Sequence, residues 1–444
     1  METHTIAAIA TPPGDGGVAI IRLSGQEAFA IAIACSTLKT LKSHTVHYSK
    51  ILTEQGESLD EVLIIPMKGP RSFTGEDVVE IHCHGGRLIT QAVLARVLEA
   101  GATPAGPGEF TMRAFLNGKC DLTQAEAIQS LICAKNQKAV KAATRQLEGA
   151  LTQKVTTCQK ELTELTAIIE AWVDYPEEGL EFMSESDFID NLERIHSSLI
   201  ELMNTYRDGK IISEGLELCL IGAPNAGKSS LMNALLGKDR AIVTEIAGTT
   251  RDVIEDELMI DNLHFVITDT AGIRKTDEII EREGIRRTEK KAQEADLTLL
   301  LIDASKPFTD TVILEKVHPE TTLIVFNKID LPHTLPKLPF KSVSISAKSG
   351  EGISTLKQAI CGLALKSSTG SSRDIIVTEE RHFVALKKAD HALVAAKEGL
   401  QNGLSPELIS LELKEALRAL GQIIGTDVAE DILSAIFAKF CVGK

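Results

Sequence analysis

The stretch GAPNAGKSS, residues Gly222–Ser230, decides the fold of the central part of the chain. It holds the pattern G-x-x-x-x-G-K-S between the apolar run LELCLI and a helical pattern, which is the context of a phosphate-binding loop. In such a loop, backbone N–H groups and the N-terminus of the following helix hold phosphate oxygens. We therefore expect Lys228 to bridge the β- and γ-phosphates of a nucleotide and Ser229 to bind Mg²⁺.

Three further motifs follow at the ends of predicted strands. In DTAG (Asp269–Gly272), the Asp is suited to hold Mg²⁺ through water, and the Gly amide is suited to meet the γ-phosphate. NKID (Asn327–Asp330) ends in a carboxylate that can accept hydrogen bonds from N1–H and the 2-amino group of guanine, two donors that adenine lacks. SAK (Ser346–Lys348) would support the base with a main-chain amide. Together the motifs predict a GTPase domain.

The segment between these motifs is expected to act as a switch. TEIAGTTRD (Thr244–Asp252) offers Thr250 as a second Mg²⁺ ligand. Ile273 stands where Ras-type GTPases carry a Gln that orients the attacking water, so another group must do this, and the acidic stretch DEIIEREG (Asp277–Gly284) lies just downstream. Asn225 either holds a monovalent cation against the phosphates or only shapes the loop, and the residues alone favour neither.

Composition limits the other possibilities. The 444 residues predict about three domains, and the formal net charge of −15 opposes indiscriminate binding to nucleic acid, so an RNA partner needs a local basic patch or a basic partner protein. No apolar run reaches the roughly 18 residues of a membrane span, and the start does not read as a secretory signal. Eight scattered cysteines without a C-x-x-C pair fit a reducing cytoplasm. The ending CVGK does not fit a prenylation signal.

Changes of pattern along the chain predict four segments. They are a mixed strand and helix segment at 1–119, helices at 120–213, alternating strands and helices at 214–368, and helices again at 369–444. Apolar residues recur every three or four positions from Leu147 to Trp172, and a second helix follows the break at DYPEEG, which predicts an antiparallel helix pair. The predicted fold is multidomain α+β and α/β, with an N-terminal mixed α/β domain, a helical bundle and an inserted P-loop GTPase domain whose sheet is mostly parallel.

The whole chain resembles the tRNA modification GTPases of bacteria and organelles called MnmE or TrmE. The resemblance rests on ATPPGDGGVAIIRLSG, SFTGEDVVE, HGG, PGEFTMRAFLNGKCDLTQAEAI, the GTPase motifs and the terminal Cys-x-Gly-Lys. It implies that residues 1–119 bind folate and dimerise, that K⁺ promotes dimerisation of the GTPase domains, and that the protein is a cytoplasmic homodimer without a membrane partner. It also implies a heterotetramer or larger complex with a flavin- and NADH-dependent partner of the MnmG (GidA) type. That complex would modify C5 of the wobble uridine (U34) of tRNA with a 5-formyl-tetrahydrofolate-type donor.

The resemblance implies roles for particular residues. The GTP-binding set is Asn225, Ala226, Gly227, Lys228, Ser229, Ser230, Thr244, Glu245, Ile246, Ala247, Gly248, Thr249, Thr250, Asp269, Thr270, Ala271, Gly272, Asn327, Lys328, Asp330, Ser346, Ala347 and Lys348. The K⁺ ligands would be Asn225, Thr244, Ile246 and Thr249, beside Ser229 and Thr250 for Mg²⁺. The folate contacts would be Arg22, Glu80, Lys119 and Lys444. Glu281 would orient the water, and Cys441 would be a catalytic thiol in a tail that meets the folate domain.

Several alternatives stay open. An assembly GTPase that docks on ribosomal RNA would explain the GTPase motifs but not the first 120 residues, and a folate-dependent one-carbon enzyme with a fused GTPase would overlap with the leading hypothesis. Cys441 is either a nucleophile or a small packed side chain. His82 and His84 lie on one face of a strand and are interpreted as structural rather than as metal ligands.

Overall fold

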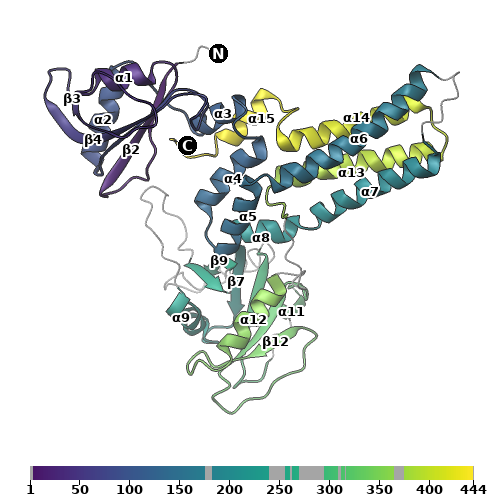
Figure 1. Ribbon diagram of the computed structural model, residues 1–444. Coiled ribbons are helices and arrows are strands. Elements are labelled where there is room, and N and C mark those ends of the chain that lie inside the picture. The colour runs from purple at the N-terminus through teal and green to yellow at the C-terminus, as the bar shows by residue number, and fades with distance from the viewer. Residues whose placement is uncertain are drawn as a thin grey trace, which may run out of the picture. The chain divides into compact units, whose positions relative to one another are not determined.

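The computed structural model describes residues 4–175, 183–239, 256–260, 263–269, 295–308, 312–315, 317–364 and 375–443. The chain divides into two compact units, whose elements are labelled in Figure 1. The first unit comprises Met1–Gln129, Gln146–Leu192 and His391–Lys444, and the second comprises Ser130–Arg145 and Glu193–Asp390. Each unit therefore combines segments that lie far apart in the sequence.

The first unit contains a six-stranded sheet in the order β3-β4-β5-β2-β1-β6. Its strands are β1 (Ile6–Ile9), β2 (Val18–Ser24), β3 (His47–Leu52), β4 (Ser58–Met67), β5 (Val78–His84) and β6 (Thr103–Pro104). Neighbouring strands are antiparallel except for the parallel pair β1 and β6. The helices α1 (Ala28–Ala34) and α2 (Arg87–Glu99) pack against the sheet. The mixed α/β character expected for the N-terminal segment is confirmed.

Alternation along the strands decides which side chains face the helices. In β2, Ile21 and Leu23 are fully buried in one apolar cluster with residues of α2. Successive side chains of a strand point to opposite faces, so Arg22 lies on the face away from that cluster. Glu80 takes the equivalent place in β5, next to the buried Ile81. Two charged side chains are thereby placed together on the other face of the sheet.

The remaining described part of the first unit is mostly helical. It includes α3 (Glu109–Leu116), α4 (Leu122–Cys133) as far as Gln129, and α6 (Ala150–Asp174). The expected apolar seam of α6 is buried, and the helix packs along its length against α14 (Pro406–Ile424) (Figure 1). The expected pairing of consecutive helices is corrected in part. The main partner of α6 comes from near the end of the chain, because α14 presents a matching buried stripe.

The other helices of the bundle segments are α5 (Gln137–Leu147), α7 (Glu185–Met203), α8 (Tyr206–Glu214), α13 (Glu380–Gln401) and α15 (Glu430–Phe437). The rings of Trp172 in α6 and Phe188 in α7 lie 6.2 Å apart, so these two helices still meet at one end. No helix in the described ranges is long and apolar enough to cross a membrane.

The second unit is built on a six-stranded sheet in the order β12-β11-β10-β7-β9-β8. Its strands are β7 (Leu216–Gly222), β8 (Asp256–Ile260), β9 (Leu263–Asp269), β10 (Leu297–Asp303), β11 (Thr322–Asn327) and β12 (Lys341–Ser344). All pairs are parallel except β8 with β9, as expected for an α/β domain. The helices that follow its strands include α9 (Lys228–Asp239), α11 (Val312–Glu315) and α12 (Ile353–Ala364).

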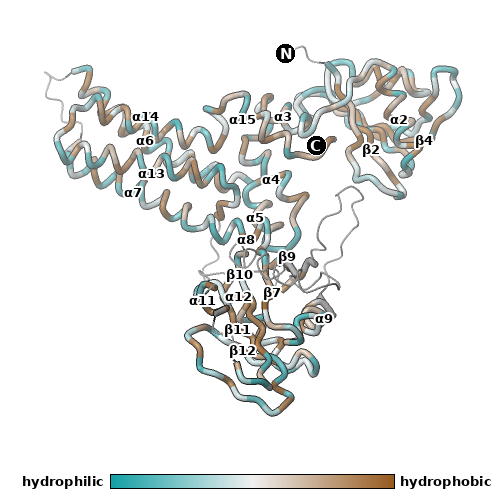
Figure 2. The backbone as a smooth tube through the Cα atoms, turned by 180° about the vertical axis from the view of Figure 1, so that it is seen from behind, coloured by the Kyte–Doolittle hydropathy of each residue, from teal (hydrophilic) through white to brown (hydrophobic). Residues whose placement is uncertain are grey.

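The strands of this sheet are short apolar runs in the sequence because their side chains are buried on both faces of the sheet. In β7, Leu218 and Leu220 belong to one buried cluster, and Cys219 and Ile221 belong to another. Both faces of the central strands are therefore covered, which is the usual environment of a parallel sheet. Figure 2 shows β7, β10 and β11 in the hydrophobic colour. The carboxyl ends of β7, β10 and β11 meet at one edge, where ligands of such sheets bind.

Candidate functional site

The phosphate-binding loop joins the end of β7 to the start of α9. Asn225 and Gly227 have φ angles of 63° and 102°, in the left-handed region, so the chain turns sharply within the loop. A Cβ atom at Gly227 would lie 2.3 Å from Asn327 Nδ2, so no side chain fits there. Lys228 Nζ lies within the turn and donates to the carbonyls of Gly222 and Ala223 at 2.6 and 3.1 Å. This arrangement suits a group of negative charge held by backbone amides.

Asn327, at the end of β11, joins the loop to the other motifs. It is 2% exposed, and its Nδ2 donates to the carbonyl oxygen of Ala226 at 2.8 Å. Its Oδ1 accepts a hydrogen bond from the backbone N–H of Ala347 at 3.0 Å. One buried amide side chain thus fixes the phosphate-binding loop and the SAK loop relative to the NKID motif.

The carboxylate predicted to recognise guanine is also held in place. Ser346 is fully buried, and its Oγ donates to Asp330 Oδ1 at 2.7 Å. The same Oγ accepts a hydrogen bond from the backbone N–H of Ser349 at 3.2 Å. The Asp330 side chain therefore has a set orientation before any base arrives, and pre-organised acceptors bind with a smaller loss of conformational entropy.

An ion pair between Lys328 and Asp303, which the sequence did not reveal, lies beside the phosphate-binding loop at the carboxyl ends of the strands. Lys328 Nζ lies 2.7 Å from Asp303 Oδ2 and donates to the carbonyl of Asn225 at 2.8 Å. Burial tends to raise the pKa of the Asp303 carboxyl, but hydrogen bonds from Lys328 and Ser305 outweigh it and hold that pKa below its ordinary value of 3.8. Asp303 ends β10, so its place at the carboxyl end of a buried strand was the only signal in the sequence.

Much of the predicted nucleotide site lies outside the described residues. These positions are Thr244, Glu245, Ile246, Ala247, Gly248, Thr249, Thr250, Thr270, Ala271, Gly272 and Glu281. Asp269 is described only as the last residue of β9. Ser229 and Ser230 are exposed in the first turn of α9, and Lys348 is exposed beside Ala347. A hydroxyl at the start of that helix fits a Mg²⁺ ligand, but the full Mg²⁺ and K⁺ ligand sets stay predictions.

A second group of predicted residues meets on the sheet of the first unit. Arg22 of β2 pairs directly with Glu80 of β5 across the antiparallel ladder. Arg22 Nη2 lies 2.9 Å from Glu80 Oε1, and both side chains are 18% exposed. The guanidinium carbon of Arg22 lies 5.5 Å from the ring centre of Phe73 and 5.8 Å from that of Phe110. The cation is therefore held by a carboxylate and by two aromatic rings.

Lys119 reaches the loop that carries Phe73. Its Nζ donates to the carbonyl of Pro70 at 2.9 Å. Its side chain also passes close to Gly75, where an added Cβ would lie 3.3 Å from Lys119 Cγ. The structure therefore places Arg22 and Lys119 against one loop, residues 68–77, although it records no direct contact between the two cations.

The terminal motif lies against the same unit. The backbone N–H of Gly108 donates to the carbonyl of Cys441 at 3.3 Å, and Val442 forms a bridge with Pro107. Arg22 Nη1 donates to the carbonyl of Gly443 at 3.5 Å. Gly443 has a φ angle of 93°, and a Cβ there would lie 2.2 Å from the carbonyl oxygen of Ile9. The tail is thus docked through its backbone, while the side chain of Cys441 is exposed and Lys444 lies outside the described residues.

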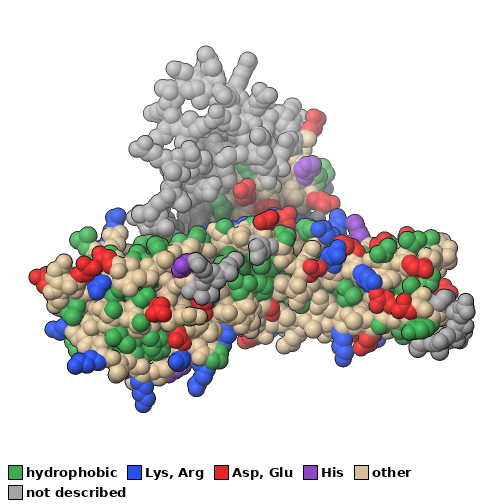
Figure 3. All heavy atoms as spheres, turned by 90° about the horizontal axis from the view of Figure 1, so that it is seen from above, with side chains coloured by type: hydrophobic (Ala, Val, Ile, Leu, Met, Phe, Trp, Pro, Cys, Tyr) green, Lys and Arg blue, Asp and Glu red, His purple; other side chains and the backbone are tan. Residues whose placement is uncertain are grey.

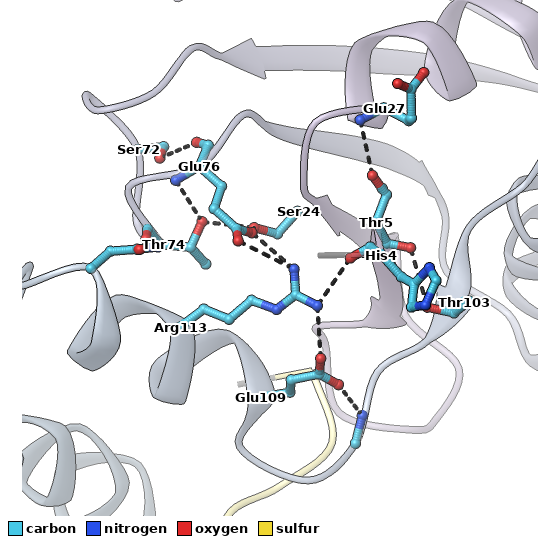
Figure 4. A network of polar contacts seen from close by, with 12 residues as sticks. His4, Thr5, Ser24, Glu27, Ser72, Thr74, Glu76, Thr103, Glu109 and Arg113 are labelled. Carbon is cyan, nitrogen blue, oxygen red and sulfur yellow. Dashed lines mark hydrogen bonds and ion pairs between the residues drawn. The ribbon is translucent and has the colours of Figure 1, made fainter. Parts of the chain in front are cut away.

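Arg113 forms a polar network beside this site that the sequence did not reveal (Figure 4). Its Nη1 lies 3.1 Å from Glu76 Oε2, and its Nη2 donates to Glu109 Oε1 at 2.8 Å and to the carbonyl of His4 at 3.0 Å. Glu76 also accepts a hydrogen bond from Ser24 Oγ at 2.7 Å. The spacing of Glu109 and Arg113 on α3 was a weak signal. The network joins the loop of Phe73 to α3 and to His4, which lies just before β1.

The two histidines of β5 have separate partners. His82 Nε2 lies 3.3 Å from Glu80 Oε2, and His84 Nδ1 lies 2.7 Å from Asp60 Oδ1. Within the described ranges, no group of three His, Cys, Asp or Glu side chains is arranged to hold a metal ion. Each histidine thus contacts a different carboxylate.

Known proteins that are similar to this chain match it over nearly its full length. Residues 5–119 match the family model for the GTP-binding protein TrmE N-terminus, and residues 122–441 match that for the MnmE helical domain. A tRNA modification GTPase MnmE of Protochlamydia amoebophila is 52% identical over 99% of this chain and 98% of its own. Proteins of the same name from Syntrophus aciditrophicus and Acetivibrio thermocellus are 43% and 42% identical, each over 100% of both chains. Because its similarity to these proteins extends over essentially its full length, the chain belongs to the MnmE family.

Proposed function

We propose that this protein hydrolyses GTP as a component of the complex that modifies C5 of the wobble uridine (U34) of tRNA. The observation that carries the proposal is the buried side chain of Asn327, which joins the phosphate-binding loop to the base-recognition loops. The names of the similar proteins, tRNA modification GTPase MnmE, supply the substrate class. The contacts of Asn327 support a single nucleotide site formed by these loops, and the family name supports a role for that site in tRNA modification.

The residues proposed for this site have separate roles in binding and hydrolysing the nucleotide. The loop amides and Lys228 bind the phosphates, and Asp330 receives the two guanine donors. Mg²⁺, bound by Ser229 and Thr250, would neutralise charge on the phosphates.

We propose Asn225, Thr244, Ile246 and Thr249 as ligands of a K⁺ ion that promotes dimerisation of the GTPase domains. Glu281 would orient the attacking water, since Ile273 has no polar group.

Substitution of Asp330, the residue proposed to recognise guanine, tests whether the nucleotide is GTP. In Asp330→Asn, the side-chain amide would turn an N–H group toward the 2-amino group of guanine, so two donors would face each other. Xanthine carries an oxygen at that position and restores the hydrogen bond. We expect GTP affinity to fall at least 100-fold and affinity for xanthosine triphosphate to rise. A variant that misfolds would bind neither nucleotide, and unchanged GTP affinity would contradict the assignment.

The N-terminal site is proposed to bind 5-formyl-tetrahydrofolate or a related reduced folate, which supplies the one-carbon group. The pterin edge resembles guanine, so a carboxylate such as Glu80 can accept its paired donors, and the glutamyl tail requires cations such as Arg22, Lys119 and Lys444. The contacts of Arg22 with Glu80 and with the carbonyl of Gly443 support this, because they bring two of the proposed side chains and the terminal motif together.

The complete enzyme is proposed to be a cytoplasmic homodimer that joins a flavin- and NADH-dependent partner of the MnmG type. Mass analysis of tRNA nucleosides tests this function directly. A strain that lacks the gene should lose a C5 substituent on the wobble uridine, and the wild-type gene should restore it. Normal nucleosides together with defective ribosomal particles would instead support the assembly GTPase.

A further inference from the structure

Residues 127–147 contain four cations and no Asp or Glu, although the whole chain has a formal net charge of −15. The cations are Lys135, Lys138, Lys141 and Arg145, and the last three belong to α5. On the face of the molecule drawn in Figure 3, by contrast, Lys and Arg side chains are interspersed with Asp and Glu. The stretch around α5 is therefore a local excess of positive charge on an acidic protein.

The helix gathers these charges on one side. At about 100° per residue, Lys138, Lys141 and Arg145 lie within an arc of roughly 60°. From Lys138 to Arg145 they extend over about 10 Å of helix axis. The side chains of Lys138 and Lys141 are exposed, and that of Arg145 is half-buried. We refer to Lys138, Lys141 and Arg145 as the basic face of α5.

The opposite side of α5 fixes this orientation. Ala139 and Ala143 are buried, at 6% and 4% exposure. Just before the helix, Asn136 is 6% exposed and donates from Nδ2 to the carbonyl of Ile212 in α8 at 2.9 Å. Asn136 Oδ1 also accepts a hydrogen bond from the backbone N–H of Ala139 at 2.8 Å. The helix is held on one side and therefore presents its basic face to solvent in a fixed direction.

We propose that the basic face of α5 binds the phosphate backbone of the tRNA. This inference rests on the proposed function, which supplies a polyanionic substrate. An overall charge of −15 repels nucleic acid, so direct binding by this chain requires a local excess of cations; the acidic residues nearest to this stretch in the sequence, Glu126 and Glu148, lie just outside it. Lysine ammonium groups bind phosphate as point charges and read no base, so this face would position the tRNA without selecting its sequence.

Salt dependence of tRNA binding by the full-length protein tests the proposal. Each lysine that neutralises a phosphate steepens the slope of log Kd against log salt by about 0.7 to 0.9. We expect Lys138→Gln/Lys141→Gln to lower that slope by between one and two. At ~0.1 M KCl, the same change corresponds to tRNA binding about 10- to 100-fold weaker. GTP hydrolysis without tRNA should not change, because neither lysine lies in the nucleotide site.

A matched variant separates a specific face from a general effect of charge. Lys387→Gln/Lys388→Gln removes the same charge from two exposed positions of α13 in the same unit. This control should keep the wild-type slope. Equal slopes for the wild type and Lys138→Gln/Lys141→Gln would overturn the inference, as would equal losses in both double variants. The proposed function is judged separately by tRNA nucleosides of the deletion strain, so each idea can fail without the other.

Discussion

Arg22 and Glu80 face each other across the β2–β5 ladder, and Nη2 of the first lies 2.9 Å from Oε1 of the second. The same guanidinium donates to the carbonyl of Gly443, more than four hundred residues later in the chain. A single arginine thus connects the proposed folate carboxylate to the terminal motif. A ligand that binds Glu80 will therefore also affect Arg22, which donates a hydrogen bond to the terminal motif.

Glu80→Gln should weaken binding of 5-formyl-tetrahydrofolate at least tenfold, because the amide cannot accept two donors of a pterin edge. It should also lower the free energy of unfolding by about 1 to 3 kcal/mol, since Arg22 would lose a partly buried partner. Titration calorimetry and thermal unfolding measure the two effects. Glu61→Gln is the matched control, because Glu61 pairs with Lys50 at an exposed place on the same sheet. Equal folate affinity in both variants would refute the role of Glu80.

Asp303→Asn should reduce GTP affinity several-fold, because Lys328 would lose the carboxylate that places it against the phosphate-binding loop. The folded pKa of Asp303 is depressed, so its stabilising effect is fully present above about pH 4 and is lost as the pH falls through that folded pKa. The difference in stability between wild type and variant should therefore be constant between about pH 5 and 8.

The control for this variant is Asp296→Asn. Asp296 lies at the other end of β10 and accepts a hydrogen bond from the backbone N–H of Glu217 at 3.0 Å. It should leave GTP affinity unchanged in a fluorescent nucleotide titration. If Asp303→Asn binds GTP as tightly as this control, the ion pair has no role in placing the loop.

The sequence predicted local features of the site better than contacts between distant segments. The phosphate-binding loop is a continuous stretch, so its glycines, its lysine and the following helix could be recognised by spacing alone. The network of Arg113 and Glu76 joins residues 37 positions apart, and their meeting depends on how a loop and a helix pack. The pairing of α6 with α14 depends in the same way on tertiary packing, because several helices present an apolar stripe that could fill the seam.

GTP hydrolysis should be faster in K⁺ than in Na⁺ at equal ionic strength. Asn225 lies in the phosphate-binding loop with a left-handed backbone, and Ile273 cannot orient water. A cation held there would stabilise charge that develops on the phosphates, and Na⁺ is too small to fill a cavity sized for K⁺. Measurement of phosphate release in the two chlorides checks this, and Asn225→Ala should abolish the difference. Equal rates in wild type would contradict a K⁺ site.

Glu281→Ala should lower the rate of GTP hydrolysis at least tenfold while GTP affinity stays within about twofold. The carboxylate is proposed to act on the attacking water, an interaction that matters mainly in the transition state. Single-turnover hydrolysis and nucleotide titration separate the two quantities. An unchanged rate would move the role to another acid of the stretch, and Asp277→Ala and Glu278→Ala are the next variants to measure.

Cys441→Ser should abolish tRNA modification and leave folding, GTP hydrolysis and folate binding nearly unchanged. The tail is docked through backbone groups of Cys441 and Gly443, so a change of the exposed thiol should not release it. Near neutral pH a hydroxyl is a far weaker nucleophile than a thiol in equilibrium with its thiolate. Mass analysis of tRNA nucleosides in a complemented deletion strain measures the modification.

Two further variants separate the chemistry of the thiol from the position of the tail. Cys441→Ala keeps a small apolar side chain, so a purely packed cysteine would tolerate it, whereas a nucleophile would not. Gly443→Ala keeps the thiol but places a Cβ 2.2 Å from the carbonyl of Ile9, so it should displace the tail from Arg22. Normal modification in both Cys441 variants, with loss only in Gly443→Ala, would mean that the tail completes the folate site and supplies no nucleophile. Loss in all three, with folate binding kept only in the Cys441 variants, is the result that we expect.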